Sequence, residues 1–204
     1  MIIIGITGSI GMGKTTIALM LRRLSIPVFD SDSEVREILE NNEKAKREIT
    51  KIWPDVIIKE ARRTKINKIL LSKIIFRDKK NREKIEKIIH PLVKKSRDVF
   101  IKINQSSLII ALDVPLLYET GTDRICDEVF LAYTNENKQK ERVLKRANMS
   151  EEIFNSIKKA QWDTEKKKKK NPYLITTTYG KLASFLLVIM YLIMVVIKKK
   201  VFKL

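Results

Sequence analysis

Short apolar runs alternate along the chain with longer stretches in which apolar residues recur every three or four positions. The runs have the length of strands buried on both faces, whereas the longer stretches have the period of helices that bury one face. Strands that alternate with helices predict a doubly wound parallel sheet, so we expect an α/β fold with about five strands. The expected strands are 1–6, 26–30, 108–112, 128–133 and 173–177.

The segment 34–103 departs from this alternation, because helical spacing dominates and strand signal is weak. Trp53-Pro54-Asp55 predicts a turn. Pro91 predicts that a helix ends at His90, because the residue before proline is pushed out of the helical region. The segment is too long for an ordinary crossover, so we interpret it as a helical substrate-binding insertion.

The polar segment 135–170 predicts two exposed basic helices, 136–146 and 151–161, which suit a lid that closes over a nucleotide. The nucleotide-binding core then consists of 1–33, 104–134 and 171–180. Asp32 or Ser33 is expected to cap the helix after the second strand.

The tail 181–204 is atypical, because 182–197 is almost wholly apolar and is flanked by Lys181 and Lys198-Lys199-Lys200. Sixteen helical residues span about 24 Å, short of the roughly 30 Å hydrocarbon core of a bilayer. Three interpretations stay open: a short membrane anchor, a buried terminal helix, or a C-terminus altered by a frameshift.

The composition adds a strong positive charge, with a formal net charge of +18 over 204 residues. Such a balance suggests nucleic acid or an anionic membrane. The sequence has no nucleic-acid recognition module, so we expect no nucleic-acid partner. Its single cysteine and single histidine exclude an intrachain disulfide and a Cys/His metal cluster. The first apolar run leads straight into a glycine-rich loop instead of a cleavage site, which favours a cytoplasmic protein. The oligomeric state is left open.

The strongest motif is the segment 8–15, GSIGMGKT, which fits the phosphate-loop pattern G-x-x-x-x-G-K-[ST] between a predicted strand and a predicted helix. Its backbone N–H groups and the helix N-terminus would cradle a polyphosphate. Lys14 would reach the β- and γ-phosphates, and the Thr15 hydroxyl would be a ligand of Mg²⁺. The predicted ATP-binding residues here are Gly11, Met12, Gly13, Lys14, Thr15 and Thr16.

Acidic residues follow two of the predicted strands, where parallel strands face a ligand crevice. Asp30 could act as a general base toward an acceptor hydroxyl, with Asp32 beside it. Asp113 ends a strand in the manner of a Walker B acid and could hold the magnesium shell. The alternative for each is a turn or capping role.

Arg142 and Arg146 lie four residues apart on one predicted helix, where two guanidinium groups could clamp a triphosphate. The alternative is a solvated basic face.

In order and spacing, these motifs resemble the dephospho-coenzyme A kinase family over residues 3–177. The matching segments are IGITGSIGMGKTT (4–16), PVFDSD (27–32), HPLV (90–93), DVPLLYE (113–119), RVLKR (142–146) and Gln161. The resemblance implies a P-loop kinase that uses ATP and Mg²⁺ to phosphorylate the ribose 3′-hydroxyl of dephospho-coenzyme A. It implies catalytic roles for Asp30, Lys14 and Arg142. It implies a substrate site that includes Asp32, His90, Pro115, Leu116, Leu117 and Glu119. The chain departs from the family at Thr176-Thr177-Thr178, where an Asp or Asn commonly lies near the adenine.

Two other classes stay as alternatives: another small-molecule P-loop kinase, and a membrane-attached nucleotide-binding protein. A shikimate kinase needs a second glycine cluster, and the six glycines here supply none. A GTPase-like switch lacks its guanine-reading motif, because Asn67-Lys68 continues as Ile69-Leu70.

Overall fold

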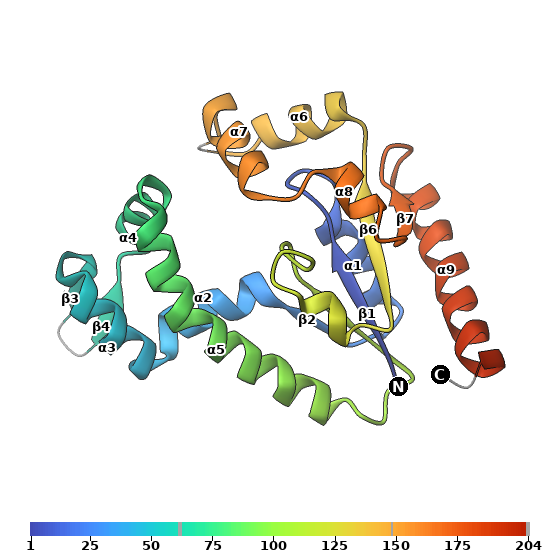
Figure 1. Ribbon diagram of the computed structural model, residues 1–204, viewed down its shortest axis with the longest axis horizontal. Coiled ribbons are helices and arrows are strands. Elements are labelled where there is room, and N and C mark those ends of the chain that lie inside the picture. The colour runs from blue at the N-terminus through green and yellow to red at the C-terminus, as the bar shows by residue number, and fades with distance from the viewer. Residues whose placement is uncertain (61–62, 148, 203–204) are drawn as a thin grey trace. The chain divides into compact units, whose positions relative to one another are not determined.

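The computed structural model describes residues 1–60, 63–147 and 149–202. The chain divides into two compact units, one of residues 1–29 and 104–204 and the other of residues 30–103. Figure 1 shows the course of the chain through both units.

A five-stranded sheet forms the centre of the first unit, in the order β2-β5-β1-β6-β7. The ladders β1–β5, β1–β6 and β6–β7 are parallel, and Ile4 of β1 lies opposite Ala111 on one side and Glu128 on the other. The bounds are Ile2–Thr7 (β1), Val28–Asp30 (β2), Ile109–Asp113 (β5), Glu128–Tyr133 (β6) and Tyr173–Thr176 (β7). The predicted α/β fold with about five parallel strands is confirmed.

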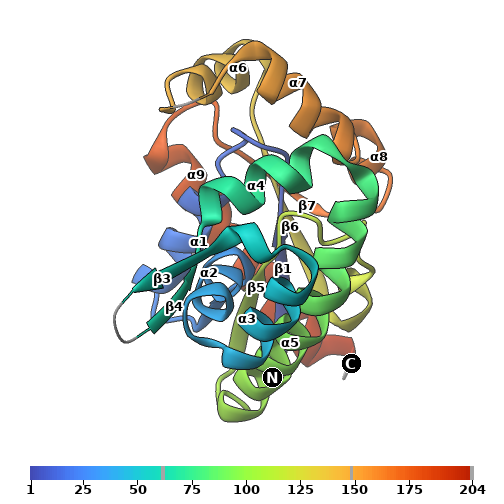
Figure 2. The same ribbon diagram turned by 90° about the vertical axis from the view of Figure 1, so that its left-hand side faces the viewer.

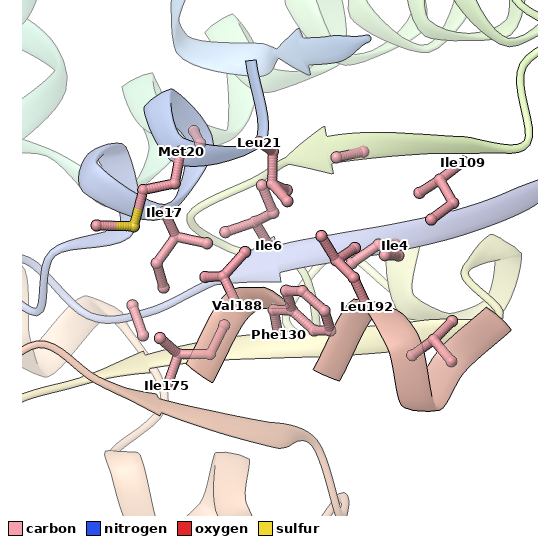
Figure 3. Packing of buried hydrophobic residues seen from close by; sticks show 14 of the residues in the cluster. Ile4, Ile6, Ile17, Met20, Leu21, Ile109, Phe130, Ile175, Val188 and Leu192 are labelled. Atoms are coloured by element: carbon pink, nitrogen blue, oxygen red, sulfur yellow. The ribbon is translucent and has the colours of Figure 1, made fainter. Parts of the chain in front are cut away.

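The helices α1 (Lys14–Arg23) and α9 (Lys181–Phe202) contact each other and pack on this sheet. Figure 3 shows the core that they share: Ile17 and Met20 of α1 lie in one cluster with Val188 and Leu192 of α9, and the last two lie beside Phe130. In β5, Ile109 and Ala111 face this core, whereas the alternate residues Ile110 and Leu112 are fully buried on the other face, which explains why the strand is a continuous apolar run.

The order of the strands places β1 in the middle, with β5 on one side and β6 on the other. Open α/β sheets bind their ligands at such a switch point, beyond the carboxyl ends of the strands. The loops that follow β1 and β5 therefore line the expected binding edge.

Three helices follow β6: α6 (Glu136–Leu144), α7 (Glu151–Ala160) and the short α8 (Thr164–Lys168). The sequence predicted the first two. It did not predict α8, whose five residues fall largely within the lysine run. Asn135, Ser150 and Asp163 cap the three helices with side-chain oxygens, which explains where each helix begins.

The second unit contains helices and one hairpin around its own core (Figure 2). Its elements are α2 (Ser31–Asn41), α3 (Glu43–Ile52), the 3₁₀ turn η1 (Pro54–Val56), β3 (Ile57–Glu60), β4 (Arg63–Ile66), α4 (Lys68–Arg77) and α5 (Lys79–Ile103). Ile49, Val56, Leu71, Ile85 and Ile89 are among its buried residues. The turn predicted at Trp53–Asp55 is confirmed by η1.

Two expectations for this unit are wrong. The antiparallel hairpin β3–β4 stands where little strand signal was found, because its four-residue strands pair only with each other and carry several charged side chains. Helix α5 also continues through Pro91. Proline removes one backbone hydrogen bond, but Ile85 and Ile89 before it and Leu92 and Val93 after it pack in one cluster and keep the helix continuous.

The tail forms α9, which buries Ser184, Val188, Leu192 and Val195 against the sheet. Ser184 Oγ donates to the carbonyls of Thr176 and Gly180 and fixes the start of the helix. The helix is long and apolar enough to span a membrane by length and composition, although core helices of soluble proteins also meet this test. Of the three interpretations, a terminal helix packed on the core fits these contacts.

Candidate active site

The phosphate loop connects β1 to α1 through two glycines with positive φ, Gly11 (78°) and Gly13 (95°). A Cβ at Gly13 would lie 2.8 Å from Thr177 Oγ1, and one at Gly11 would lie 2.6 Å from Val143 Cγ2. The loop is therefore packed so closely against α6 and the end of β7 that only glycine fits at both positions.

Two glutamines hold the Ile10 peptide of the loop from opposite sides. Gln139 Nε2 of α6 donates to the Ile10 carbonyl over 2.7 Å, and the Ile10 N–H donates to Gln161 Oε1 over 3.0 Å. Gln139 is almost completely buried, so its bond is shielded from water. Helix α6 and the segment after α7 are thus bonded directly to the phosphate loop.

Lys14 and Asp113, which the sequence placed in one site, form an ion pair of 2.5 Å between Nζ and Oδ1. Asp113 is 2% exposed, at the end of β5. Thr15 follows on the first turn of α1 and is exposed. A threonine hydroxyl and an aspartate carboxylate are the oxygen ligands that Mg²⁺ prefers, so this edge of the sheet fits the ion. Among the residues that the structure describes, no group of three or more His, Cys, Asp or Glu side chains could hold a metal ion.

Arg142 reaches the phosphate loop through Thr177. Its guanidinium donates to Thr177 Oγ1 over 2.8 Å and to the Thr177 carbonyl over 2.7 Å. Thr177 Oγ1 in turn donates to the Met12 carbonyl over 2.9 Å. Arg146, beyond the end of α6, is exposed. The two arginines of the predicted clamp therefore differ: one is bonded at the loop and the other faces solvent.

The loop after β5 is fastened to the end of β1. Thr7 Oγ1 donates to the Pro115 carbonyl over 3.0 Å, and the Val114 N–H donates to the Ile6 carbonyl over 3.0 Å. Leu117 is fully buried next to Gly5, whereas Pro115 and Leu116 are half-buried. Of the expected substrate residues in this loop, Pro115 and Leu116 retain accessible surface.

Glu119, at the end of this loop, pairs with a residue that the sequence did not single out. Its Oε1 accepts from the Trp162 N–H over 2.7 Å and lies 3.2 Å from Lys167 Nζ. Lys167 is completely buried, and burial lowers the pKa of its ammonium group while the charge of Glu119 opposes that shift. Within a run of five lysines, nothing in the sequence distinguishes Lys167 from its solvated neighbours.

Two aromatic rings and several buried polar atoms lie at or next to the pair Glu119–Lys167. Tyr118 stacks on Trp162 with 6.1 Å between ring centroids, and burial raises the pKa of Tyr118 to about 12. Within residues 1–60, 63–147 and 149–202, three buried side-chain atoms have no hydrogen-bond partner: Tyr118 OH, Glu119 Oε2 and Lys167 Nζ. Because Gln161 bonds to Ile10 and Trp162 to Glu119, this cluster anchors the segment that reaches the phosphate loop.

The other predicted residues lie in the second unit. Asp30 Oδ1 accepts from the Ser33 N–H over 3.0 Å and caps α2, so the expectation that Asp32 or Ser33 caps this helix is wrong. The helix begins at Ser31, earlier than a cap at Asp32 or Ser33 would allow, because the carboxylate of Asp30 is already in capping position at the end of β2. Asp32 and His90 are exposed, on α2 and α5.

Comparison with known proteins places this site in a family. A family model described as dephospho-CoA kinase matches residues 2–180. The dephospho-CoA kinase of Jannaschia sp. is 36% identical over 164 residues, which cover 80% of this chain and 82% of the relative.

Two solved structures share the fold. A crystal structure from Thermus thermophilus has a TM-score of 0.80 and 26% identity, and the match covers 94% of this chain and 96% of the other. The dephospho-CoA kinase from Campylobacter jejuni has a TM-score of 0.68 and 23% identity over 93% and 94% of the two chains. The family match spans the phosphate loop, Asp113, Glu119, Arg142 and Arg146, and the chain therefore belongs to the dephospho-CoA kinase family.

Proposed function

We propose that this chain transfers the γ-phosphoryl group of ATP to the ribose 3′-hydroxyl of dephospho-coenzyme A and forms coenzyme A. The observation that carries the proposal is the pair Lys14–Asp113 at a phosphate loop, within a chain that belongs to this family. The reaction uses a nucleotide and a water-soluble acceptor, so we place it in the cytoplasm.

The ATP end of the proposal rests on the loop. Backbone N–H groups from Gly11 to Thr16 would bind the phosphates, with help from the N-terminus of α1. Lys14 would exchange Asp113 for the β- and γ-phosphates when ATP binds. Thr15 and Asp113 would hold Mg²⁺, which neutralises charge on the phosphate oxygens when it is bound.

Arg142 and Arg146 would act on the transferred group from the lid that α6 to α8 form. Arg142 already lies at Thr177, next to the Met12 carbonyl, and would need only a local change to reach a phosphate. Arg146 is exposed and would be recruited when the lid closes. Both guanidinium groups would offset negative charge in the transition state.

At the acceptor end, Asp30 would take the proton of the 3′-hydroxyl as its oxygen attacks the γ-phosphorus. The bond from that phosphorus to the ADP oxygen breaks, ADP leaves, and Asp30 later returns the proton to solvent. Asp32, His90, Pro115, Leu116, Leu117 and Glu119 are the proposed substrate-side residues. Leu117 and Glu119 would act mainly by shaping the loop, because both are largely buried.

The experiment that tests this function is an acceptor panel. ADP release is followed with purified protein, Mg-ATP and, in turn, dephospho-coenzyme A, adenosine, shikimate or no acceptor. We expect turnover above background only with dephospho-coenzyme A. Faster turnover with another acceptor would make the chain a different small-molecule kinase, and turnover that ignores every acceptor would make it an ATPase.

A further inference from the structure

Helix α9 presents a continuous apolar face to solvent. Its outward face consists of Leu182, Leu186, Met190, Ile193, Ile197 and Val201, all of them exposed. These positions follow one another at intervals of three or four residues, so they form one stripe along the helix. The residues buried against the sheet form a second stripe on the opposite side of the helix. A stripe of this length is an unusual surface for a soluble enzyme, and it marks an interaction site.

The helix is firmly docked along its whole length. Val188 and Leu192 reach into the core beside Phe130, as Figure 3 shows. At the far end Lys198 bonds to Glu128, and Lys199 Nζ donates to the Met1 carbonyl over 2.6 Å. Spanning a bilayer would break these contacts and expose the core of the sheet, so a partner must meet α9 where it lies.

The helix is also part of the shared fold. The match to the Thermus structure covers 94% of this chain, and the remainder is shorter than α9, so part of α9 has a counterpart there. The family model, in contrast, ends at residue 180. The position of the helix is therefore common to a structural relative, while its sequence lies outside the family pattern.

The charges around the outward face of α9 are positive and favour an anionic partner. Lys181 and Lys200 lie exposed at the two ends of the helix, and α9 contains no acidic residue. In a dimer formed through this face, each lysine end would meet a lysine end of the second copy, in either helix orientation, with no acid on α9 to neutralise it. A surface of anionic lipid offers both an apolar interior and negative headgroups, and the net charge of +18 adds to that attraction.

We propose that the outward face of α9 docks onto an anionic lipid surface, with the helix lying in the plane of that surface. The stripe inserts among the acyl chains near the headgroups, while Lys181 and Lys200 contact lipid phosphates. The buried stripe stays on the sheet, so the enzyme binds as a folded unit. This binding does not depend on the proposed kinase activity.

The test is flotation of the full chain with vesicles of phosphatidylcholine alone and of phosphatidylcholine mixed with phosphatidylglycerol. We expect the chain to float with the mixed vesicles and to be released by salt or by an alkaline carbonate wash, as an in-plane contact predicts. The triple variant Leu186→Gln, Ile193→Gln, Ile197→Gln should reduce the bound fraction about tenfold. Lys181→Gln with Lys200→Gln should reduce binding to the mixed vesicles only.

A matched control uses exposed apolar residues elsewhere: Ile69→Gln, Ile103→Gln, Leu108→Gln. These side chains are 62–74% exposed, against 54–59% for the three positions in α9. The control variant should bind like the wild type, and all variants should keep the wild-type melting temperature and far-UV spectrum.

Three results would overturn the proposal. The first is a wild-type chain that binds to neither type of vesicle in the flotation assay. The second is a wild-type dimer in analytical ultracentrifugation, together with a monomeric triple variant and no binding to vesicles. That result would assign the outward face of α9 to contact with a second copy of the chain. The third is vesicle-bound protein that resists the carbonate wash, which would make α9 a spanning helix.

Discussion

The residues proposed for the two substrates differ in how the structure holds them. Around the phosphate loop, Lys14, Gln139, Arg142, Gln161 and Thr177 are joined by short hydrogen bonds or an ion pair, mostly out of water. The candidates for the acceptor in the second unit, Asp32 and His90, are exposed, and Asp30 is used as a helix cap.

This difference teaches that the groups proposed to bind ATP are already held in place by one another. Groups already fixed in place cost little further ordering when ATP arrives, and such preorganisation favours electrostatic stabilisation of a transition state. The exposed side chains of Asp32 and His90, which we propose for the acceptor, would have to be ordered by the acceptor itself. Substitutions in the two groups of residues should therefore change different kinetic and binding constants.

Lys14→Ala should have the largest effect. It removes the cation proposed to contact the transferred group, so kcat/KM should fall by about 10³-fold or more. Steady-state kinetics with Mg-ATP and dephospho-coenzyme A measure this, with Lys170→Ala as an exposed lysine control. Activity within tenfold of the wild type would show that Lys14 does not contact the phosphates.

Lys167→Met should have the next largest effect, on stability. Removing one partner of a buried ion pair leaves an uncompensated charge, so the free energy of unfolding should fall by about 3–5 kcal/mol. Urea denaturation measures the change. The double variant Glu119→Gln, Lys167→Met should recover most of the lost free energy of unfolding, because it leaves no unpaired buried charge. An equal loss in the single and the double variant would contradict a pairwise interaction.

Asp30→Asn should separate chemistry from nucleotide binding. Loss of the general base should lower kcat by about 10²-fold or more, while the Kd of ATP stays within about twofold. Asparagine still caps a helix well, so α2 keeps its start. Single-turnover kinetics and calorimetric titration of ATP give the two numbers, and a kcat close to the wild type would remove Asp30 from the chemistry.

His90→Ala should have the smallest effect. An exposed side chain that contacts only the acceptor should raise the KM for dephospho-coenzyme A by about tenfold or less and leave kcat and the Kd of ATP unchanged. Lys87→Ala, one turn earlier on α5 and also exposed, is the matched control. Equal changes in both variants would assign the effect to the surface charge of α5.

The sequence predicted the features that depend on local pattern. The five strands of the sheet were found within about two residues because a strand buried on both faces is an apolar run. The phosphate loop was found because its glycines serve conformations and close approaches that other residues cannot adopt. Lys14 and Asp113 could be paired from topology alone, since both follow neighbouring parallel strands.

The features that were missed depend on distant partners. Pro91 stays inside α5 because of side chains that pack on both sides of it, and Lys167 is buried because Glu119 lies opposite. The hairpin β3–β4 is set by pairing between two short segments. In α9, the even apolar composition concealed a buried stripe and an outward stripe, which only the packing separates.

The central claim is the identity of the phosphorylated product. The reaction of wild-type protein with Mg-ATP and dephospho-coenzyme A is quenched, and the product is identified by chromatography, mass spectrometry and phosphorus NMR. We expect coenzyme A with its new phosphate on the ribose 3′-oxygen, and no such product with Lys14→Ala. A phosphate on any other oxygen, or unchanged dephospho-coenzyme A beside released ADP, would contradict it.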